Sequence, residues 1–343
     1  MVGAVLVRDG EVVGEGYHRR VGGPHAEVEA LRDAGDRARG ATLYVTLEPC
    51  NHHGRTPPCS QAVIEAGIRR VVACHRDPFP QVGGQGFARL RAAGIEVESG
   101  LLVEKAVQLN WRFLTSVVQQ RPAVTLKWAM SLDGRIATSS GESQWISSPG
   151  GRRWGLGQRE EHDAILVGSG TALADDPRLN RRLGQASEPN HRIVLDRRLR
   201  LPAASAMFEI PGEILIYTES KDDRAADRLR ERGGTVIHLS RVEPEEVLSD
   251  LHGRGVQSLL IEGGGTVAAA FLEAGCFDRV AVDCAPILIG GAEAPGPLGG
   301  RGLGALASAP RLADLRVERR DGDLILVGFE EKCLQDLYES VAD

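Results

Sequence analysis

The sequence predicts two consecutive domains of the α/β class. Segments that favour β-strands alternate with segments that favour helices along the chain, which is typical of layered α/β folds. The length of 343 residues also exceeds what one hydrophobic core usually organises. A long helical segment ends near Gln120 and Pro122 follows as a stop signal, so we expect one domain at 1–120 and a second at 121–343.

The first domain opens with two β-rich runs joined by Asp9-Gly10, a pair suited to a tight hairpin because glycine tolerates a positive φ. Beyond the hairpin, helices and strands alternate. We expect helices within 25–35, 57–67, 87–94 and 102–120, and strands within 41–49, 69–75 and 95–100.

The second domain repeats this alternation with more strands. We expect strands at the start of 122–138 and within 164–169, 192–196, 213–218, 235–239, 258–264 and 279–286, with helices that include 224–233 and 244–255. The last segment, 315–330, contains Asp321-Gly322 between two β-rich runs and predicts a second antiparallel hairpin.

Composition disfavours several classes of partner. The net charge is -6, and positive and negative residues are interspersed without a basic run that would follow a phosphate backbone. No apolar run approaches the roughly 20 residues of a membrane helix, and six cysteines are too sparse for a disulfide framework. We therefore expect a soluble, cytoplasmic protein that binds neither nucleic acid nor membrane.

Two stretches of the first domain predict a metal site. His25 opens a helix, and Cys50 and Cys59 flank a proline-rich loop, which makes three ligands of the kind that catalytic zinc takes while it keeps a fourth position for water. Cys59 follows Pro57-Pro58 at the expected start of a helix, where the helix dipole favours a thiolate. Glu27, two positions after His25, is the expected proton carrier.

This pattern resembles the signature of zinc deaminases, except that eight residues rather than two separate the cysteines. The longer insert, NHHGRTPP, resembles the pyrimidine deaminase of riboflavin biosynthesis. That resemblance implies a cytidine-deaminase-like, three-layer domain with Glu27 as the catalytic residue, Zn²⁺ on the three ligands and a phosphorylated pyrimidine substrate. It further implies that His18, His52 and Arg55 contact this substrate.

A nucleotide site is expected in the second domain. An apolar strand runs into Gly263-Gly264-Gly265 and then into a helix near Thr266, where exposed amides and the helix dipole suit a pyrophosphate. The segments that begin at Gly168 and Gly302 match the dinucleotide fingerprint poorly.

The stretches KWAMSLDGRIAT, GESQWISSP, REEHDAILVGSGTALADDPRLN and IEGGGTVAAAFL resemble the reductase half of the bifunctional riboflavin-biosynthesis deaminase/reductase. The resemblance implies a dihydrofolate-reductase-like domain that uses NADPH and associates with further copies of itself. The implied cofactor-binding residues are Ala129, Trp145, Thr171, Asp175, Gly264, Gly265, Thr266, Val267, Ala268, Ala269 and Ala270. The implied substrate-binding residues are Ser143, Arg159, Leu179, Arg182 and Glu262.

Physical considerations add to this assignment. The guanidinium groups of Arg159 and Arg182 suit recognition of a sugar phosphate. Lys127 is a candidate proton donor or charge stabiliser near the nicotinamide. Where the family often has serine, this chain has Arg197, so one nucleotide contact is absent or Arg197 meets a 2′-phosphate instead.

Two alternative functions remain open at this stage. The family normally has a helix and a Pro-Asn-Pro run before VGAVLV, whereas this chain starts at Met1-Val2-Gly3. One alternative is therefore a reductase that carries an inactive, truncated deaminase domain. The other is a non-catalytic, zinc-stabilised binding module, which would close the metal's coordination shell and make Glu27 dispensable.

Overall fold

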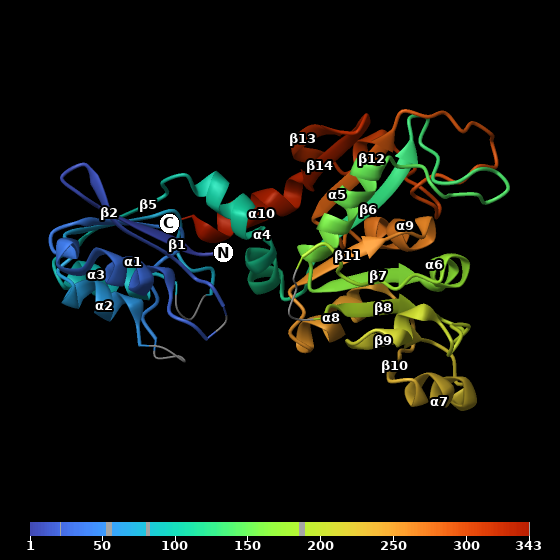
Figure 1. The fold of residues 1–343 in the computed structure, drawn as a ribbon, viewed down its shortest axis with the longest axis horizontal. Coiled ribbons are helices and arrows are strands. Elements are labelled where there is room, and N and C mark those ends of the chain that lie inside the picture. The colour runs from blue at the N-terminus through green and yellow to red at the C-terminus, as the bar shows by residue number, and fades with distance from the viewer. Residues whose placement is uncertain (21, 53–56, 80–82, 185–188, 343) are drawn as a thin grey trace. The chain divides into compact units, whose positions relative to one another are not determined.

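The computed structural model describes residues 1–20, 22–52, 57–79, 83–184 and 189–342 (Figure 1). It divides into two compact units, Met1–Gln119 with Gln335–Asp343, and Gln120–Leu334. The sequence had placed residues 335–343 in the second domain, whereas here they group with the first unit. None of the helices in the described ranges is long and apolar enough to cross a membrane.

The first unit contains a five-stranded sheet in the order β2-β1-β3-β4-β5. The hairpin strands β1 and β2 are antiparallel, β1 also runs antiparallel to β3, and β3 to β5 are parallel. The strands are β1 (Gly3–Arg8), β2 (Glu11–Tyr17), β3 (Thr42–Val45), β4 (Arg70–Ala73) and β5 (Glu96–Ser99). The helices are α1 (Ala26–Ala34), the 3₁₀ turn η1 (Gly35–Ala38), α2 (Cys59–Glu65), α3 (Gln85–Ala92) and α4 (Val103–Gln119).

Helix α1 lies unusually close to strand β2. A Cβ on Gly16 would lie 2.3 Å from the carbonyl oxygen of Ala26, and a Cβ on Gly14 would lie 2.5 Å from that of Ala30. Alanines of α1 fill the remaining space in the core of this unit. The glycines of β2 thus determine where the first turn of α1 lies, and with it the residues at the helix start.

The second unit is built on a nine-stranded sheet in the order β10-β9-β8-β7-β11-β6-β12-β14-β13. All neighbours are parallel except β14, which is antiparallel to both β12 and β13. The strands are β6 (Ala123–Ser131), β7 (Ala164–Gly168), β8 (His191–Leu195), β9 (Ile214–Thr218), β10 (Gly234–His238), β11 (Ser258–Glu262), β12 (Arg279–Ala285), β13 (Leu312–Arg320) and β14 (Asp323–Glu330).

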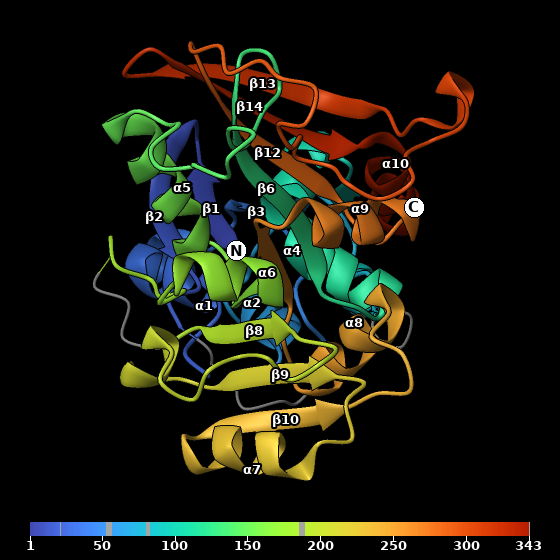
Figure 2. The same ribbon diagram turned by 90° about the vertical axis from the view of Figure 1, so that its right-hand side faces the viewer.

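Helices cover both faces of this sheet, and Figure 2 shows β8, β9 and β10 in succession with α7 beyond them. The α-helices are α5 (Pro149–Glu160), α6 (Ser169–Asp175), α7 (Asp223–Glu231), α8 (Pro244–Gly253) and α9 (Gly265–Glu273). Helix α10 (Glu331–Val341) begins in this unit, and its residues from Gln335 onward group with the first unit. The short 3₁₀ turns are η2 (Ala206–Glu209) and η3 (Leu306–Ser308).

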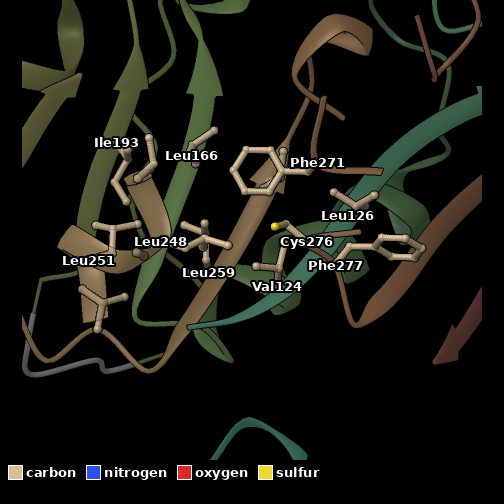
Figure 3. Packing of buried hydrophobic residues seen from close by; sticks show 14 of the residues in the cluster. Val124, Leu126, Leu166, Ile193, Leu248, Leu251, Leu259, Phe271, Cys276 and Phe277 are labelled. Carbon is tan, nitrogen blue, oxygen red and sulfur yellow. The ribbon is translucent and has the colours of Figure 1, made fainter. Parts of the chain in front are cut away.

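The larger apolar core lies between the sheet and helices α8 and α9 (Figure 3). Leu248 and Leu251 of α8 and Phe271 of α9 pack on side chains that alternate strand residues direct to this face. A second cluster on the opposite face involves α6 and α7. Burial of each such leucine or phenylalanine contributes about 1.5–3 kcal/mol, so both helical layers are firmly attached to the sheet.

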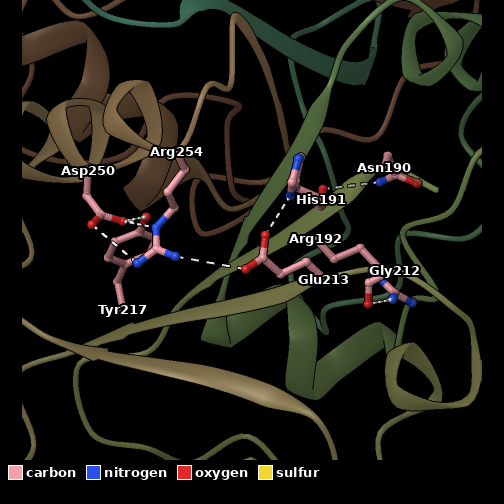
Figure 4. Close-up of polar contacts among 8 residues, drawn as sticks. All are labelled: Asn190, His191, Arg192, Gly212, Glu213, Tyr217, Asp250 and Arg254. Carbon is pink, nitrogen blue, oxygen red and sulfur yellow. Dashed lines mark hydrogen bonds and ion pairs between the residues drawn. The ribbon is translucent and has the colours of Figure 1, made fainter. Parts of the chain in front are cut away.

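A polar network joins α8 to strands β8 and β9 (Figure 4). The Tyr217 hydroxyl donates to Asp250 at 2.7 Å, and Arg254 donates to the same carboxylate at 2.6 Å. Arg254 also lies 3.9 Å from Glu213, which accepts from His191 at 2.9 Å. Burial and the Asp250 carboxylate raise the pKa of Tyr217, so this hydroxyl stays protonated and keeps donating.

The structure confirms the predicted α/β class, both hairpins and every strand named from the sequence. Helices α5, α6 and α10 had not been predicted. Helix α5 has the sequence PGGRRWGLGQRE, whose four glycines lower its intrinsic helix propensity. Its start is nevertheless well formed, because the Ser148 side chain accepts the Gly151 N–H at 3.1 Å and Pro149 occupies the first turn.

Candidate functional site

The first candidate site lies at the start of helix α1. His25 precedes the first turn with an extended backbone (φ -75°, ψ 162°), and its imidazole makes no capping hydrogen bond. The ring points instead toward two sulfurs, with Nδ1 3.1 Å from Sγ of Cys59 and 3.5 Å from Sγ of Cys50. The nitrogen and both sulfurs lie within 4.8 Å of one another.

The start of helix α2 organises the two cysteines. Cys59 is the first residue of α2, and its backbone N–H donates to Sγ of Cys50 at 3.3 Å. Hydrogen bonds from the Cys59 thiol and from His25 outweigh burial and lower the pKa of Cys50 to about 4. From its sequence position, the helix start is expected to stabilise the Cys59 thiolate, whereas in the structure the Cys59 amide donates to the Cys50 sulfur.

Glu27 lies in the first turn of α1 and is only 3% exposed. Its Oε2 is buried and accepts no hydrogen bond from a described residue. Burial raises the pKa of this carboxyl to about 7. A buried acceptor without a partner, beside one imidazole and two thiols, fits a site that holds a divalent metal ion and a water molecule.

Other predicted residues of the first unit lie around this cluster. The His18 ring lies edge-on to that of His25, with centroids 5.5 Å apart, and its Nδ1 is 3.0 Å from the Pro24 carbonyl oxygen. His52 is exposed in the loop after Cys50. Arg55 lies outside the described residues.

Glu48, two residues before Cys50, was not singled out from the sequence. Its buried carboxylate accepts backbone N–H groups from Asp77 at 3.0 Å, Gly84 at 2.8 Å and Phe87 at 3.1 Å. These hydrogen bonds fix the loop after β4 and the start of α3 against the segment that leads to Cys50. The sequence feature that could have identified Glu48 is the presence of an acidic residue in the short segment TLEP.

The second candidate site begins where strand β11 ends. Gly263 and Gly264 both have positive φ, 81° and 80°, and α9 starts at Gly265. A Cβ on Gly264 would lie 3.3 Å from Oγ1 of Thr171, which the sequence placed in the same nucleotide site. The strand thus turns tightly into a helix start, an arrangement that suits an anionic phosphate group.

Only the beginning of the predicted stretch from Gly264 to Ala270 lies at this turn. Thr266 is exposed and Val267 half-buried, whereas Ala268 and Ala269 are buried against the core. The Val267 and Ala268 amides donate to the Gly264 carbonyl oxygen at 2.9 and 3.1 Å, so the Gly265 and Thr266 amides are the first-turn candidates for a ligand. The alanines allow close packing of α9 on the sheet.

Arg159 and Glu262 form a buried ion pair. Nε and one terminal nitrogen of Arg159 donate to both carboxylate oxygens at 2.5–3.1 Å, and both side chains are largely shielded from solvent. Burial alone would raise the pKa of Glu262, but the charges of Arg159, Lys127 and Arg182 outweigh it, and the pKa is lowered. Arg182, more exposed than Arg159, lies close enough to interact electrostatically with both partners of the pair.

The other predicted residues of the second unit are distributed as follows. Ala129 is half-buried on β6, and Ser143 and Trp145 belong to the segment between β6 and α5. Trp145 is 69% exposed, with the Arg152 guanidinium 4.8 Å from its ring centre. Asp175 is exposed at the end of α6.

The side chains of two residues have surroundings other than those expected from the sequence. Leu179 has φ 50° and its side chain is buried in the core, so it offers a ligand only backbone atoms. Arg197 donates to the Val242 carbonyl oxygen at 3.2 Å and lies 3.3 Å from Glu219. This cation therefore has a carboxylate partner within the protein.

Comparison with known proteins matches a different family model to each part of the chain. The model of the RibD C-terminal domain matches residues 122–326, and that of the cytidine and deoxycytidylate deaminase zinc-binding region matches residues 1–75. The chain belongs to the RibD family. The riboflavin biosynthesis protein RibD of Aquifex aeolicus is 42% identical over 325 residues, which cover 95% of this chain and 90% of that protein. RibD of Escherichia coli is 43% identical over 341 residues, covering 95% and 93%.

Solved RibD structures share the fold. RibD of Acinetobacter baumannii has a TM-score of 0.85 at 38% identity, with 96% of this chain and 91% of that chain covered. A diaminohydroxyphosphoribosylaminopyrimidine deaminase/5-amino-6-(5-phosphoribosylamino)uracil reductase of Thermotoga maritima has a TM-score of 0.84 at 37% identity, with the same coverage. This member of the RibD family is thus a bifunctional riboflavin-biosynthesis enzyme with a deaminase and a reductase domain.

Proposed function

We propose that the deaminase domain hydrolyses the amino group of 2,5-diamino-6-(5-phosphoribosylamino)pyrimidin-4-one and that the reductase domain then reduces the ribosyl group. The product is 5-amino-6-(5-phosphoribitylamino)uracil. One observation carries the deaminase assignment: the unpartnered, buried Oε2 of Glu27 lies beside the cluster of His25, Cys50 and Cys59. A binding module would have no use for such a carboxylate.

His25, Cys50 and Cys59 would hold Zn²⁺, because one imidazole and two thiols match the ligand set of zinc deaminases. When bound, zinc would lower the pKa of its water toward 7. Glu27 accepts a proton from the attacking water and passes it to the departing amino group, which leaves as ammonia. Burial of the Glu27 carboxyl opposes its ionisation, which favours return of the proton to the departing group.

In the reductase domain, the glycine turn before α9 and Thr171 would hold the phosphates of NADPH, which supplies the hydride. Arg182 would bind the sugar phosphate, since Arg159 directs most of its donors to Glu262. The Arg159–Glu262 pair in turn offers a rigid polar wall to the ribose hydroxyls. The other cofactor and substrate residues expected from the sequence remain part of this proposal.

We further propose that copies of the chain associate through the reductase domain and that the enzyme works in the cytoplasm. Strand β13 is the last strand of the nine-stranded sheet, and Leu315 and Val317 on it are 54% and 58% exposed. Exposed apolar side chains on an edge strand favour pairing with another chain. The six cysteines are all free, as expected in a reducing compartment.

The proposed function is tested with the full chain. Glu27→Gln should lower ammonia release by at least about 10²-fold, a typical contribution of a general acid–base residue. It should retain zinc and oxidise NADPH normally with the deaminated substrate. Glu29→Gln, on the same helix but paired with Arg32 at 3.0 Å, is the matched control and should release ammonia normally.

Three outcomes would contradict this proposal in different ways. Undiminished ammonia release by Glu27→Gln would remove Glu27 from the mechanism. Absence of ammonia release by the wild-type chain would favour the reductase-only alternative. Absence of NADPH oxidation by the wild-type chain with deaminated substrate would contradict the reductase assignment.

A further inference from the structure

A row of charged side chains crosses four neighbouring strands of the second unit. Glu262 on β11 lies directly opposite Lys127 on β6, and Lys127 lies opposite Ala281 on β12. Asp283, two residues beyond Ala281, points to the same face because strand side chains alternate. The row therefore continues from Glu262 through Lys127 to Asp283.

The fourth strand adds a second aspartate. Asp283 lies opposite Ile325 on β14, and Asp323, two residues before Ile325, shares its face of the sheet. Both aspartates are almost fully buried, with 1% and 2% of their surface exposed. Neither aspartate belongs to a motif that is recognisable in the sequence.

Helix α5 lies directly on this row because its sequence is rich in glycine. A Cβ on Gly151 would lie 2.3 Å from Oδ2 of Asp283 and 2.3 Å from Oδ2 of Asp323. One turn later, a Cβ on Gly155 would lie 3.1 Å from Nζ of Lys127. The helix backbone thus takes the space of side chains and brings the two carboxyls together beneath it.

Two carboxyl groups held so close in a buried place cannot both be ionised without a large electrostatic cost. Burial and the neighbouring Asp323 raise the pKa of Asp283, while the Ser147 hydroxyl and Lys127 act in the opposite direction. Oδ2 of Asp323 accepts the Ser148 N–H at 2.7 Å. Oδ1 of Asp283 is buried without a hydrogen-bond partner among the described residues.

The charges around the pair balance if the two aspartates hold one proton between them. Arg159 neutralises Glu262, and the Lys127 ammonium interacts with both Glu262 and Asp283. Asp321, in the exposed turn between β13 and β14, faces Gly150. From α5 itself, Arg152 turns away to the Ser147 carbonyl oxygen at 2.8 Å.

We propose that Asp283 and Asp323 share one proton and act as a positioning pair that holds the Lys127 ammonium in the reductase site. Asp283 lies directly opposite Ala129, one of the residues expected to contact the cofactor. The pair would act on the reaction through Lys127 and would not itself touch the substrate. This inference rests on the proposed reductase function.

The two aspartates have different roles, so their variants should differ. Asp283→Asn removes the negative charge that lies nearer to the Lys127 ammonium. The alkaline limb of the pH profile for NADPH oxidation should therefore move down by about one pH unit. In Asp323→Asn the negative charge of the pair resides on Asp283 alone, beside Lys127, so this limb should stay in place or move up. Asp321→Asn is the matched control and should match the wild type.

A structural role at the start of α5 predicts another result. Asp323 accepts the Ser148 N–H, so Asp323→Asn would then lower the melting temperature most, and no variant would move the pH profile. An unmoved pH profile in Asp283→Asn would overturn the proposal. In a Lys127→Met background, Asp283→Asn should change the residual rate less than twofold, and a further large loss there would contradict action through Lys127.

Infrared spectroscopy tests the shared proton independently of any measurement of enzyme activity. Glu27, with a pKa of about 7, would contribute its own protonated-carboxyl band, so the spectra are compared in the Glu27→Gln background. At pH 7 this background should show a protonated-carboxyl band that Asp283→Asn and Asp323→Asn each remove, since each leaves one carboxylate with no partner to share a proton. A spectrum that Asp283→Asn leaves identical to that of this background would overturn the shared proton. If the wild-type chain did not oxidise NADPH, the proposed function would fail, while this spectrum would still decide the state of the pair.

Discussion

The backbone N–H of Cys59 points at the sulfur of Cys50, 3.3 Å away, at the start of helix α2. This bond, together with His25, favours the thiolate form of Cys50, which is the form that binds metal. Two ligands of the proposed zinc site are therefore oriented by one helix start.

Replacement of either cysteine should remove the metal. Cys50→Ser and Cys59→Ser should each weaken zinc binding by more than the roughly 10- to 100-fold typical of changes outside the ligand set. Elemental analysis after dialysis against a mild chelator measures this loss. Cys74→Ser, outside the cluster, should retain one zinc per chain. Full zinc content in the Cys50 variant would exclude this cysteine as a ligand.

The close contact between β2 and α1 should matter for the deaminase site. Gly16→Ala places a methyl group 2.3 Å from the Ala26 carbonyl oxygen, so the first turn of α1 must move. We expect a loss of about 1–3 kcal/mol in the free energy of unfolding and zinc affinity lowered by roughly tenfold.

The matched control for this change is Gly3→Ala on the neighbouring strand. Its new methyl group would find only the Gly16 carbonyl oxygen, at 4.0 Å. Denaturant unfolding and zinc titration should therefore show a clear loss of stability and of zinc affinity in Gly16→Ala and little change in Gly3→Ala. Equal effects at both positions would show that contact with α1 is not the cause.

The buried Arg159–Glu262 pair should make stability depend on pH. The pKa of Glu262 is lowered in the folded protein, so its contribution is fully present above the ordinary value of about 4.3 and is lost as pH falls through the folded value. Glu262→Gln should cost about 3 kcal/mol at pH 7, because it leaves a buried guanidinium unpaired. This difference should shrink in acid.

The exposed pair Asp227–Arg230, at 3.0 Å, is the control for Glu262→Gln. Asp227→Asn should change the free energy of unfolding by less than about 1 kcal/mol at either pH. Urea denaturation at pH 7 and near pH 3.5 measures both variants. A Glu262→Gln deficit that stays constant between these pH values would contradict the assigned ionisation.

The apolar residues of β13 should control association. Leu315→Glu combined with Val317→Glu adds two charges to the exposed edge strand and should convert an oligomer to monomers in sedimentation experiments. Val12→Glu, at a similarly exposed apolar position of the first unit, should leave the oligomer unchanged. A monomeric wild-type protein would contradict the proposed association.

Much of the fold and part of the candidate site could be predicted from local sequence. The Asp9-Gly10 and Asp321-Gly322 turns follow from the backbone freedom of glycine, and the strands follow from short apolar runs between turn residues. The metal cluster was predictable because two distinctive motifs, HAE and the cysteine loop, name its members. Helix α5 was not, because contacts with the sheet outweigh its poor helix propensity.

The sequence by itself determined which segments are strands and helices and which residue types are available for chemistry, since these depend on neighbours along the chain. Only the tertiary structure decided which of these residues meet. It buried the Leu179 side chain, engaged Arg197 with Glu219, and aligned Glu262, Lys127, Asp283 and Asp323 across four strands. Strand order and register bring together residues that are far apart in the chain, such as Lys127 and Glu262, and no local pattern encodes such contacts.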